Sequence, residues 1–184
     1  GDVIEDIQQH LRPTLEHIPG NKVPSSDTLL RGIKELSLAN TKVESSKGNV
    51  YNFNINHKLN NLNIKSLLLT NQLKRGEYYD FDYDNQIIAC EKYDSKRTYK
   101  KNKGYCPGVA TIGDKIVYVE NRDGNATVKI GQAQTLQNAY TILKNNDIHV
   151  NRSRMDAGSY SKEIIETVAK NSRLFYIRAN RCDD

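Results

Sequence analysis

The sequence predicts an α/β protein, in which a mixed sheet flanked by helices follows a small helical N-terminal region. Two observations predict this class. Up to about residue 76, apolar residues recur mainly at helical spacing, whereas from Tyr78 they alternate with polar residues as in a strand. Further along, strand-like and helical segments follow one another, which is typical of a sheet covered by helices. We therefore expect two regions, residues 1–76 and 77–184.

The N-terminal region is expected to contain three helices. The first covers residues 2–18, where apolar residues recur every four positions and Pro13 weakens the middle. The second follows capping residues at 24–27. The third covers residues 57–74 and has an apolar stripe of Leu59, Leu62, Leu69 and Leu73. Residues 40–52 are polar and contain Gly, Ser and Asn, so we expect a loop there.

The second region begins with a strand at Tyr78, whose alternation places Asp80, Asp82 and Asp84 on one face. Gly113-Asp114 is a hairpin signal between two further strands. A helix at residues 131–146 and a strand at residues 149–155 follow. A second helix, capped by Ser161, comes next, and the last strand covers residues 174–177. Strand, strand, strand, helix, strand, helix, strand is the order of an RNase H-like fold.

A basic segment follows the first strand of this region. Between residues 92 and 105 the only acid is Asp94, and the basic residues are Lys92, Lys96, Arg97, Lys100, Lys101 and Lys103. The excess of cations in this segment equals the net charge of the whole chain, +5. Such a cluster favours contact with nucleic acid phosphates. The alternative is an ordinary solvated loop.

Two acidic positions are candidates for chemistry. Asp84, with Asp82 as its rival, lies on the first strand, and Asp156 lies where the strand 149–155 ends in a turn. Acids that converge from two strand ends repel each other unless a cation neutralises them, and Mg²⁺ prefers oxygen ligands. The alternatives are a solvated strand face for the first strand and a turn or capping role for Asp156.

Five segments, in this order and spacing, resemble the DDE insertion-sequence transposases of bacteria, in the group called DDE transposase group one. They are Phe81-Asp82-Tyr83-Asp84-Asn85-Gln86, Lys101-Asn102-Lys103-Gly104-Tyr105-Cys106-Pro107, Asn121-Arg122-Asp123-Gly124-Asn125, Arg154-Met155-Asp156-Ala157-Gly158-Ser159-Tyr160 and Phe175-Tyr176-Ile177-Arg178-Ala179. The resemblance covers nearly all of the chain and is best from Asp82 to Arg178.

The resemblance implies an RNase H-like catalytic core that binds two divalent ions, Mg²⁺ or Mn²⁺, through Asp, Asp and Glu. Asp84 matches the first acid, with Asp82 as runner-up because Gln86 stands where the family often has Thr. Asp156 matches the second acid. The third is a Glu on a helix beyond the last strand, and these 184 residues hold no such helix. We therefore expect residues 77–184 to form a truncated core that is inactive alone.

The implied reaction is phosphoryl transfer, in which water frees a 3′-hydroxyl at a transposon end and that hydroxyl attacks target DNA. The implied partner is double-stranded DNA, and a homodimer is compatible with the resemblance. We predict phosphate contacts at Lys100, Lys101 and Lys103, and lesser ones at Arg97, Arg122 and Arg152. The N-terminal helices are expected either to contact DNA or to pack on the core.

Two other functions remain open, an RNase H-like nuclease and a non-catalytic DNA-binding relic of a transposase. The sequence has no apolar run long enough to cross a membrane and no signal peptide at its start. The three cysteines, Cys90, Cys106 and Cys182, are far apart and form no Cys-x-x-Cys pair, which is typical of reduced thiols. We expect a bacterial cytoplasmic protein associated with the nucleoid, without partners in a membrane.

Overall fold

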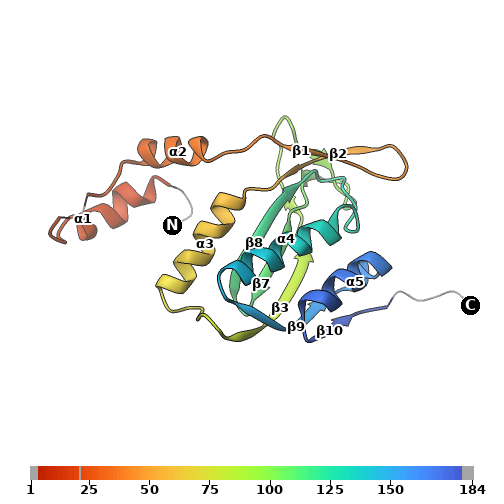
Figure 1. The fold of residues 1–184 in the computed structure, drawn as a ribbon. Helices are drawn as coiled ribbons and strands as arrows, with labels where there is room; N and C mark the ends of the chain where they lie inside the picture. Colours follow the sequence, from red (N-terminus) through yellow and green to blue (C-terminus); the bar gives the residue numbers. More distant parts are fainter. Residues whose placement is uncertain (1–3, 21, 180–184) are drawn as a thin grey trace, which may run out of the picture. The chain divides into compact units, whose positions relative to one another are not determined.

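The structure is a computed structural model that describes residues 4–20 and 22–179. The chain divides into two compact units, Gly1–Leu38 and Ala39–Asp184. This boundary lies well before residue 76, where the sequence places it. The difference arises because a hairpin and a helix between residues 39 and 76 belong to the same unit as the sheet (Figure 1).

The described residues of the first unit form helices and turns. A π-helical turn, η1 (Ile7–Leu11), leads into the short helix α1 (Arg12–Leu15), with Pro13 in its first turn. Proline is tolerated there because first-turn N–H groups have no partner within the helix. Residues 2 and 3 of the predicted helix lie outside the described residues. Helix α2 (Ser26–Glu35) is capped by Ser25, whose hydroxyl accepts a hydrogen bond from the Thr28 N–H at 3.2 Å.

The second unit is built on a mixed seven-stranded sheet with the order β1-β2-β8-β7-β3-β9-β10. The strands are β1 (Thr41–Glu44), β2 (Val50–Asn54), β3 (Tyr78–Asn85), β7 (Gly108–Ile112), β8 (Lys115–Arg122), β9 (His149–Met155) and β10 (Leu174–Ile177). Strands β3, β9 and β10 run parallel, and the other neighbouring pairs are antiparallel. The arrangement is α/β and is compatible with the expected RNase H-like fold.

The hairpin of β1 and β2 corrects one prediction, because residues 40–52 were expected to form a loop. Tyr51 and Phe53 are buried on β2 and pack with Ala126, while β2 pairs with the end of β8. The polar residues that suggested a loop lie on the exposed side of this hairpin and in its turn. A two-stranded ribbon with one apolar face needs only a few buried side chains, so composition alone did not reveal it.

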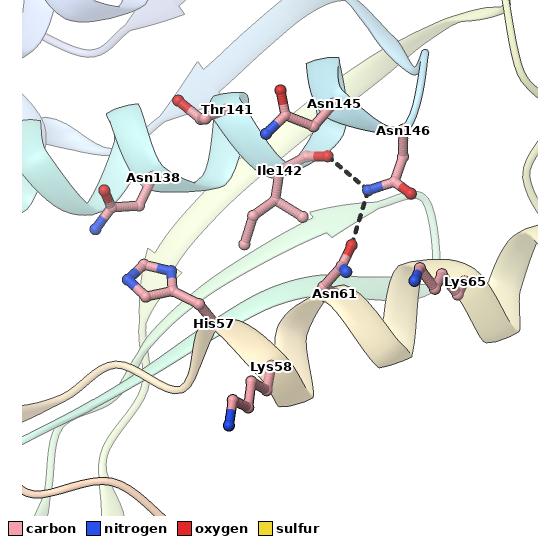
Figure 2. A pocket seen from close by; sticks show the side chains of 9 residues that line it. All are labelled: His57, Lys58, Asn61, Lys65, Asn138, Thr141, Ile142, Asn145 and Asn146. Atoms are coloured by element: carbon pink, nitrogen blue, oxygen red, sulfur yellow. Dashed lines mark hydrogen bonds between the residues drawn. The ribbon is translucent and has the colours of Figure 1, made fainter. Parts of the chain in front are cut away.

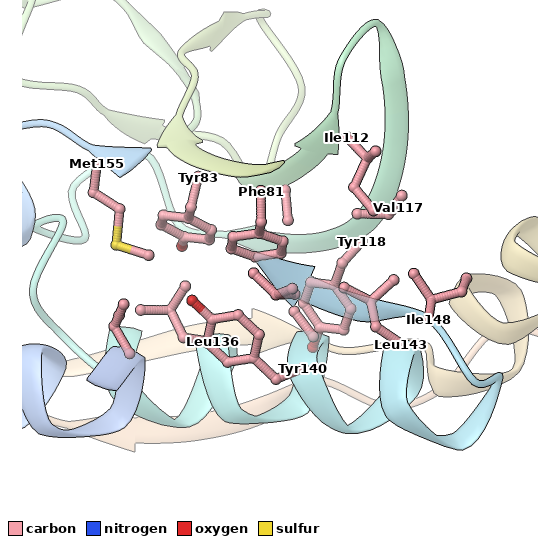
Figure 3. Close-up of a cluster of buried hydrophobic side chains, with 14 of the residues drawn as sticks. Phe81, Tyr83, Ile112, Val117, Tyr118, Leu136, Tyr140, Leu143, Ile148 and Met155 are labelled. Atoms are coloured by element: carbon pink, nitrogen blue, oxygen red, sulfur yellow. The ribbon is translucent and has the colours of Figure 1, made fainter. Parts of the chain in front are cut away.

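Three helices share one hydrophobic core with the sheet (Figure 1). They are α3 (His57–Leu69), α4 (Gln132–Asn145) and α5 (Lys162–Asn171). On β3, Phe81 and Tyr83 point into this core, and the rings of Phe81 and Tyr140 lie 4.8 Å apart between centroids (Figure 3). Asp80, Asp82 and Asp84 therefore lie on the opposite face of β3, as the alternation predicts.

Helix α3 contacts the sheet through a face that differs from the predicted one. Ile64 is fully buried, whereas Leu62 and Leu69 of the expected stripe are 54% and 85% exposed. Asn60 exchanges two hydrogen bonds with the backbone of Val119 on β8, at 2.8 and 2.9 Å. Strand β2 pairs with β8 only at residues 121 and 122, so this asparagine satisfies backbone groups farther back along the β8 edge.

The basic segment also differs from the expected loop, because it folds into a small sheet. Its strands are β4 (Ile88–Ala89), β5 (Lys96–Arg97) and β6 (Lys103–Tyr105), in the order β4-β6-β5. The backbone of Gly104 approaches that of Ile88 so closely that a side chain there would collide with it. Gly124 packs equally tightly against Gly104, so the small sheet rests on the turn that follows β8.

Cys90 and Cys106 are free thiols, and Cys182 lies outside the described residues. Within residues 4–20 and 22–179, no helix is long and apolar enough to cross a membrane.

Candidate functional site

The candidate site lies where two parallel strands end side by side. Tyr83 on β3 is opposite Met155 on β9, so the next residues, Asp84 and Asp156, leave the two strands together. Both acids line one surface depression of about 340 Å³, together with Asp82, Thr111 and Arg154 among others. The structure thus brings together the two acids that the sequence singled out.

The electrostatics of Asp84 agree with this placement. Partial desolvation on the wall of the depression raises the pKa of the Asp84 carboxyl, and repulsion from Asp156 raises it further. The N–H of Asn85 donates to Asp84 Oδ1 at 2.8 Å and partly offsets these effects on the pKa. A cation bound beside both carboxylates would relieve this repulsion.

Asp156 is held by the fold of the turn that follows it. It precedes the 3₁₀ turn η2 (Ala157–Ser159), and its side chain makes no capping hydrogen bond, so the alternative of a capping aspartate is not observed. Buried Ser159 accepts a hydrogen bond from Gln132 Nε2 on α4 at 2.6 Å, which anchors the turn to the helix. A β-carbon at Gly158 would lie 3.0 Å from Asp156 Oδ1, so glycine leaves space for the carboxylate.

Arg154 distinguishes Asp84 from its rival, Asp82. The Arg154 guanidinium binds both carboxylate oxygens of Asp82, each at 2.7 Å. Asp80 is bound in the same way by Arg152, which lowers the pKa of Asp80. Asp84, the third acid of the series, forms no ion pair with any residue in the part of the chain that the structure describes. It is therefore the acid of β3 whose charge remains uncompensated.

Sequence reasoning missed the role of Arg154. The signal was present as two matching patterns, Asp80 and Asp82 on one strand and Arg152 and Arg154 on another, each spaced by two residues. To combine them, however, one must know that β3 and β9 are neighbours in a register that puts Asp82 opposite Arg154.

The cations predicted to bind DNA fall into two groups. Arg97, Lys100, Lys101 and Lys103 are all exposed on the small sheet or its β5–β6 turn. This turn is ordered by backbone hydrogen bonds from Thr98 N–H to the Asn102 carbonyl at 2.8 Å and from Lys101 N–H to the Thr98 carbonyl at 3.0 Å. The small sheet begins three residues after β3, so it emerges from the same strand end as Asp84.

Arg122 and Arg152 do not match that prediction. Arg122 is only 1% exposed, and its Nε donates to buried Glu120 at 3.1 Å, so the interpretation of Arg122 as a phosphate contact is corrected to a structural role. Its other donors bind Thr135 and the carbonyls of Val128 and Ile130. Arg152 is exposed, but its guanidinium is bound by Asp80. Glu120, two positions before Arg122 and on the same strand face, was the sequence signal for the buried pair.

Asp84 and Asp156 offer two carboxylates to a metal ion. Among residues 4–20 and 22–179, no group of three or more His, Cys, Asp or Glu side chains is placed to hold a metal ion. Two carboxylates nevertheless fit Mg²⁺ or Mn²⁺, because these ions prefer oxygen ligands and Mg²⁺ is often bound through one or two carboxylates plus water or phosphate.

Comparison with known proteins adds little to this geometry. No protein-family model matches the chain, and no curated protein matches it. Among solved structures, a crystal structure of the Mos1 strand transfer complex is similar at a TM-score of 0.39 and 12% sequence identity. The match covers 98% of this chain and 55% of that one, so this chain spans about half of its length. A likeness at this level establishes neither a shared fold nor a shared activity.

Proposed function

We propose that this chain is part of a DNA transposase and contributes to metal-dependent phosphoryl transfer at transposon ends. The observation that carries the proposal is the pairing of Asp84 with Asp156 at the ends of adjacent parallel strands. The five strands β8-β7-β3-β9-β10, with α4 and α5 as connections, follow the arrangement expected of an RNase H-like core. The resemblance of the sequence to DDE transposases assigns metal ligation to the same two acids.

The residues of the site would act mainly by binding and orientation. Asp84 and Asp156 would hold Mg²⁺ or Mn²⁺, which when bound activates an attacking oxygen and stabilises the leaving one. Arg154 keeps Asp82 neutralised, so the charge available to a cation is concentrated on Asp84 and Asp156. The exposed lysines of the small sheet would neutralise phosphates of the DNA strand that enters the depression.

The resemblance also implies a third carboxylate, that of a Glu. Among the described residues, no third acidic side chain joins Asp84 and Asp156 in a metal-binding group. Two carboxylates supply less charge and fewer ligands than three, so we expect metal affinity to be modest. We expect this chain to bind DNA and a divalent cation, but not to cleave DNA without that further carboxylate.

The test is Mn²⁺ binding, measured by electron paramagnetic resonance. Asp84→Asn and Asp156→Asn should each weaken Mn²⁺ binding by roughly tenfold or more, because each removes one of two charged ligands. Asp82→Asn is the matched control, since it is the same substitution on the same strand face, and it should change the affinity by less than about threefold because Arg154 already neutralises Asp82. Equal losses at all three positions, or no loss at Asp84 and Asp156, would exclude the acid pair as the metal site.

DNA binding without catalysis is a second candidate, and the two-carboxylate site favours it. It predicts duplex binding that does not change when Mn²⁺ is added. The transposase proposal predicts tighter binding to a duplex end in the presence of Mn²⁺, because phosphate oxygens complete the coordination of the ion. An RNase H-like nuclease would share the acid pair, and its products would be hydrolysed strands rather than joined ones.

A further inference from the structure

A second polar surface lies between α3 and α4, away from the acid pair. A groove of about 550 Å³ separates the two helices (Figure 2). From α3 it is lined by His57, Lys58, Asn61 and Lys65, and from α4 and its C-terminal cap by Asn138, Thr141, Ile142, Asn145 and Asn146. Eight of these nine side chains are polar or charged, and Ile142 is the apolar one.

The charged side chains that line the groove, Lys58 and Lys65, are both positive. No acidic side chain lines it, and neither Lys58 nor Lys65 forms an ion pair with any residue in the described part of the chain. The two lysines are seven residues apart, which is about two helical turns, so they lie on one face of α3 at about 10 Å along its axis. At this spacing they would contact two separate anionic groups rather than one.

Two amide side chains of the groove, those of Asn61 and Asn146, are held in place by hydrogen bonds. Asn146 is 5% exposed, and its Nδ2 donates to Asn61 Oδ1 at 3.1 Å and to the Ile142 carbonyl at 2.9 Å (Figure 2). Arg75 in turn donates to the Asn146 carbonyl at 2.8 Å. Because the oxygen of Asn61 accepts from Asn146, the Asn61 Nδ2 is left as a hydrogen-bond donor, at a position of α3 between Lys58 and Lys65 in the sequence.

The groove and the acid pair are on different parts of the unit. Helix α4 packs on the sheet face that carries Phe81 and Tyr83, whereas Asp84 lies on the opposite face. Asn146 precedes β9 and Asp156 follows it, and the seven residues of this strand span roughly 23 Å. A ligand in the groove is therefore not the one at the acid pair.

We propose that this groove, defined by Lys58, Asn61, Lys65 and Asn145, binds the phosphodiester backbone of a second stretch of nucleic acid. Two lysines about 10 Å apart along α3 supply charge for separate phosphates, and amide donors bind phosphate oxygens without requiring a base sequence. The inference rests on the proposed function only in taking DNA as the polyanion, and it does not depend on metal binding by the acid pair.

The test compares duplex binding by matched charge reversals, measured by fluorescence anisotropy over a range of salt concentrations without divalent ions. Lys58→Glu/Lys65→Glu should weaken binding by at least about tenfold and make the slope of log K against log salt shallower by about two. Lys42→Glu/Lys47→Glu makes the same change of charge on the exposed β1–β2 hairpin and should weaken binding by less than about threefold. Circular dichroism checks that both variants are folded.

Equal losses in the two variants would show a general effect of net charge and would overturn the proposal. Inorganic phosphate, added at the phosphate concentration of the duplex, should not displace the DNA. If it does so as effectively as unlabelled duplex, the groove is a site for isolated anions and the proposal is wrong.

Repeating the comparison in an Asp84→Asn/Asp156→Asn background separates the two proposals. Loss on reversal of Lys58 and Lys65 in that background supports the groove even if Mn²⁺ binding to the acid pair is not found. If Mn²⁺ binding is normal but reversal of Lys58 and Lys65 weakens DNA binding no more than the control does, the groove proposal is wrong and the metal-site proposal stands.

Discussion

At the scale of single residues, Glu120 and Arg122 form a buried ion pair on β8. Both side chains are nearly inaccessible, and burial raises the pKa of Glu120 while Arg122 opposes this rise. The Arg122 guanidinium also lies over the Phe53 ring at 4.5 Å from its centroid. Arg122 therefore links β8 to β2 and, through the Val128 and Ile130 carbonyls, to the stretch that leads into α4.

Removing Arg122 should be costly for stability. Arg122→Met leaves the Glu120 charge buried without its cation, and we expect a loss of roughly 3–5 kcal/mol in the free energy of unfolding, measured by urea denaturation. The double variant Arg122→Met/Glu120→Gln removes both charges and should recover part of this loss. The single variant Glu120→Gln completes the comparison. If the double variant loses as much free energy of unfolding as the two single variants together, the two residues act independently.

The same variant should show a definite pH dependence. In Arg122→Met the folded state favours neutral Glu120, so its pKa is raised above that of the unfolded chain. The folded state then binds more protons, and stability falls as the pH rises from the unfolded pKa towards the folded one. We expect the variant to be more stable near pH 5 than near pH 7, relative to the wild-type protein. Unchanged stability differences across this range would contradict a buried, uncompensated Glu120.

At the scale of elements, the small sheet fixes the positions of the cations in the basic segment. Ser95 and Thr98 are buried in it, while the lysines remain exposed. A folded segment presents its cations at defined positions, and less entropy is lost on binding than with a flexible loop.

Neutralising these cations should change the salt dependence of DNA binding. Lys100→Gln/Lys101→Gln/Lys103→Gln should weaken duplex binding and reduce the slope of log K against log salt by roughly 2.7, or about 0.9 for each phosphate that is no longer neutralised. Lys42→Gln/Lys47→Gln/Lys129→Gln removes three exposed lysines elsewhere and serves as the control. Unchanged affinity and slope in the first variant would show that the small sheet does not bind the DNA.

At the scale of the whole molecule, the sheet, its core and the acid pair all lie within Ala39–Asp184. Among the described residues of the first unit, 4–20 and 22–38, none belongs to a strand of either sheet and none belongs to the main core. The second unit therefore contains what a cooperative fold requires.

A fragment of residues 39–184 should therefore fold by itself, with a cooperative urea transition and Mn²⁺ affinity close to that of the whole chain. A fragment of residues 77–184, cut at the boundary predicted from the sequence, should not. It lacks Ile64 of the core and Asn60 at the edge of β8, which exposes apolar surface and unpaired backbone groups. Equal stability of the two fragments would show that β1, β2 and α3 are dispensable.

Local patterns in the sequence determined several features on their own. The alternation after Tyr78 predicts the aspartates on one face of β3, Gly113-Asp114 predicts the hairpin between β7 and β8, and Ser161 predicts the start of α5. Each depends on side-chain periodicity or on a turn or cap within a few residues, which the sequence states directly. The acidic and basic candidates could be chosen in the same way from their residue types.

Only the tertiary structure decided which of these candidates belong together. The parallel register of β3 and β9 puts Asp84 beside Asp156 and Asp82 beside Arg154, and the pairing of β2 with β8 encloses Arg122. Register between strands that are some 70 residues apart depends on the packing of the whole sheet, and a shift of one residue would reverse which side chains share a face. The sequence alone therefore names the acids, and the packing of the sheet determines which two of them lie together at neighbouring strand ends.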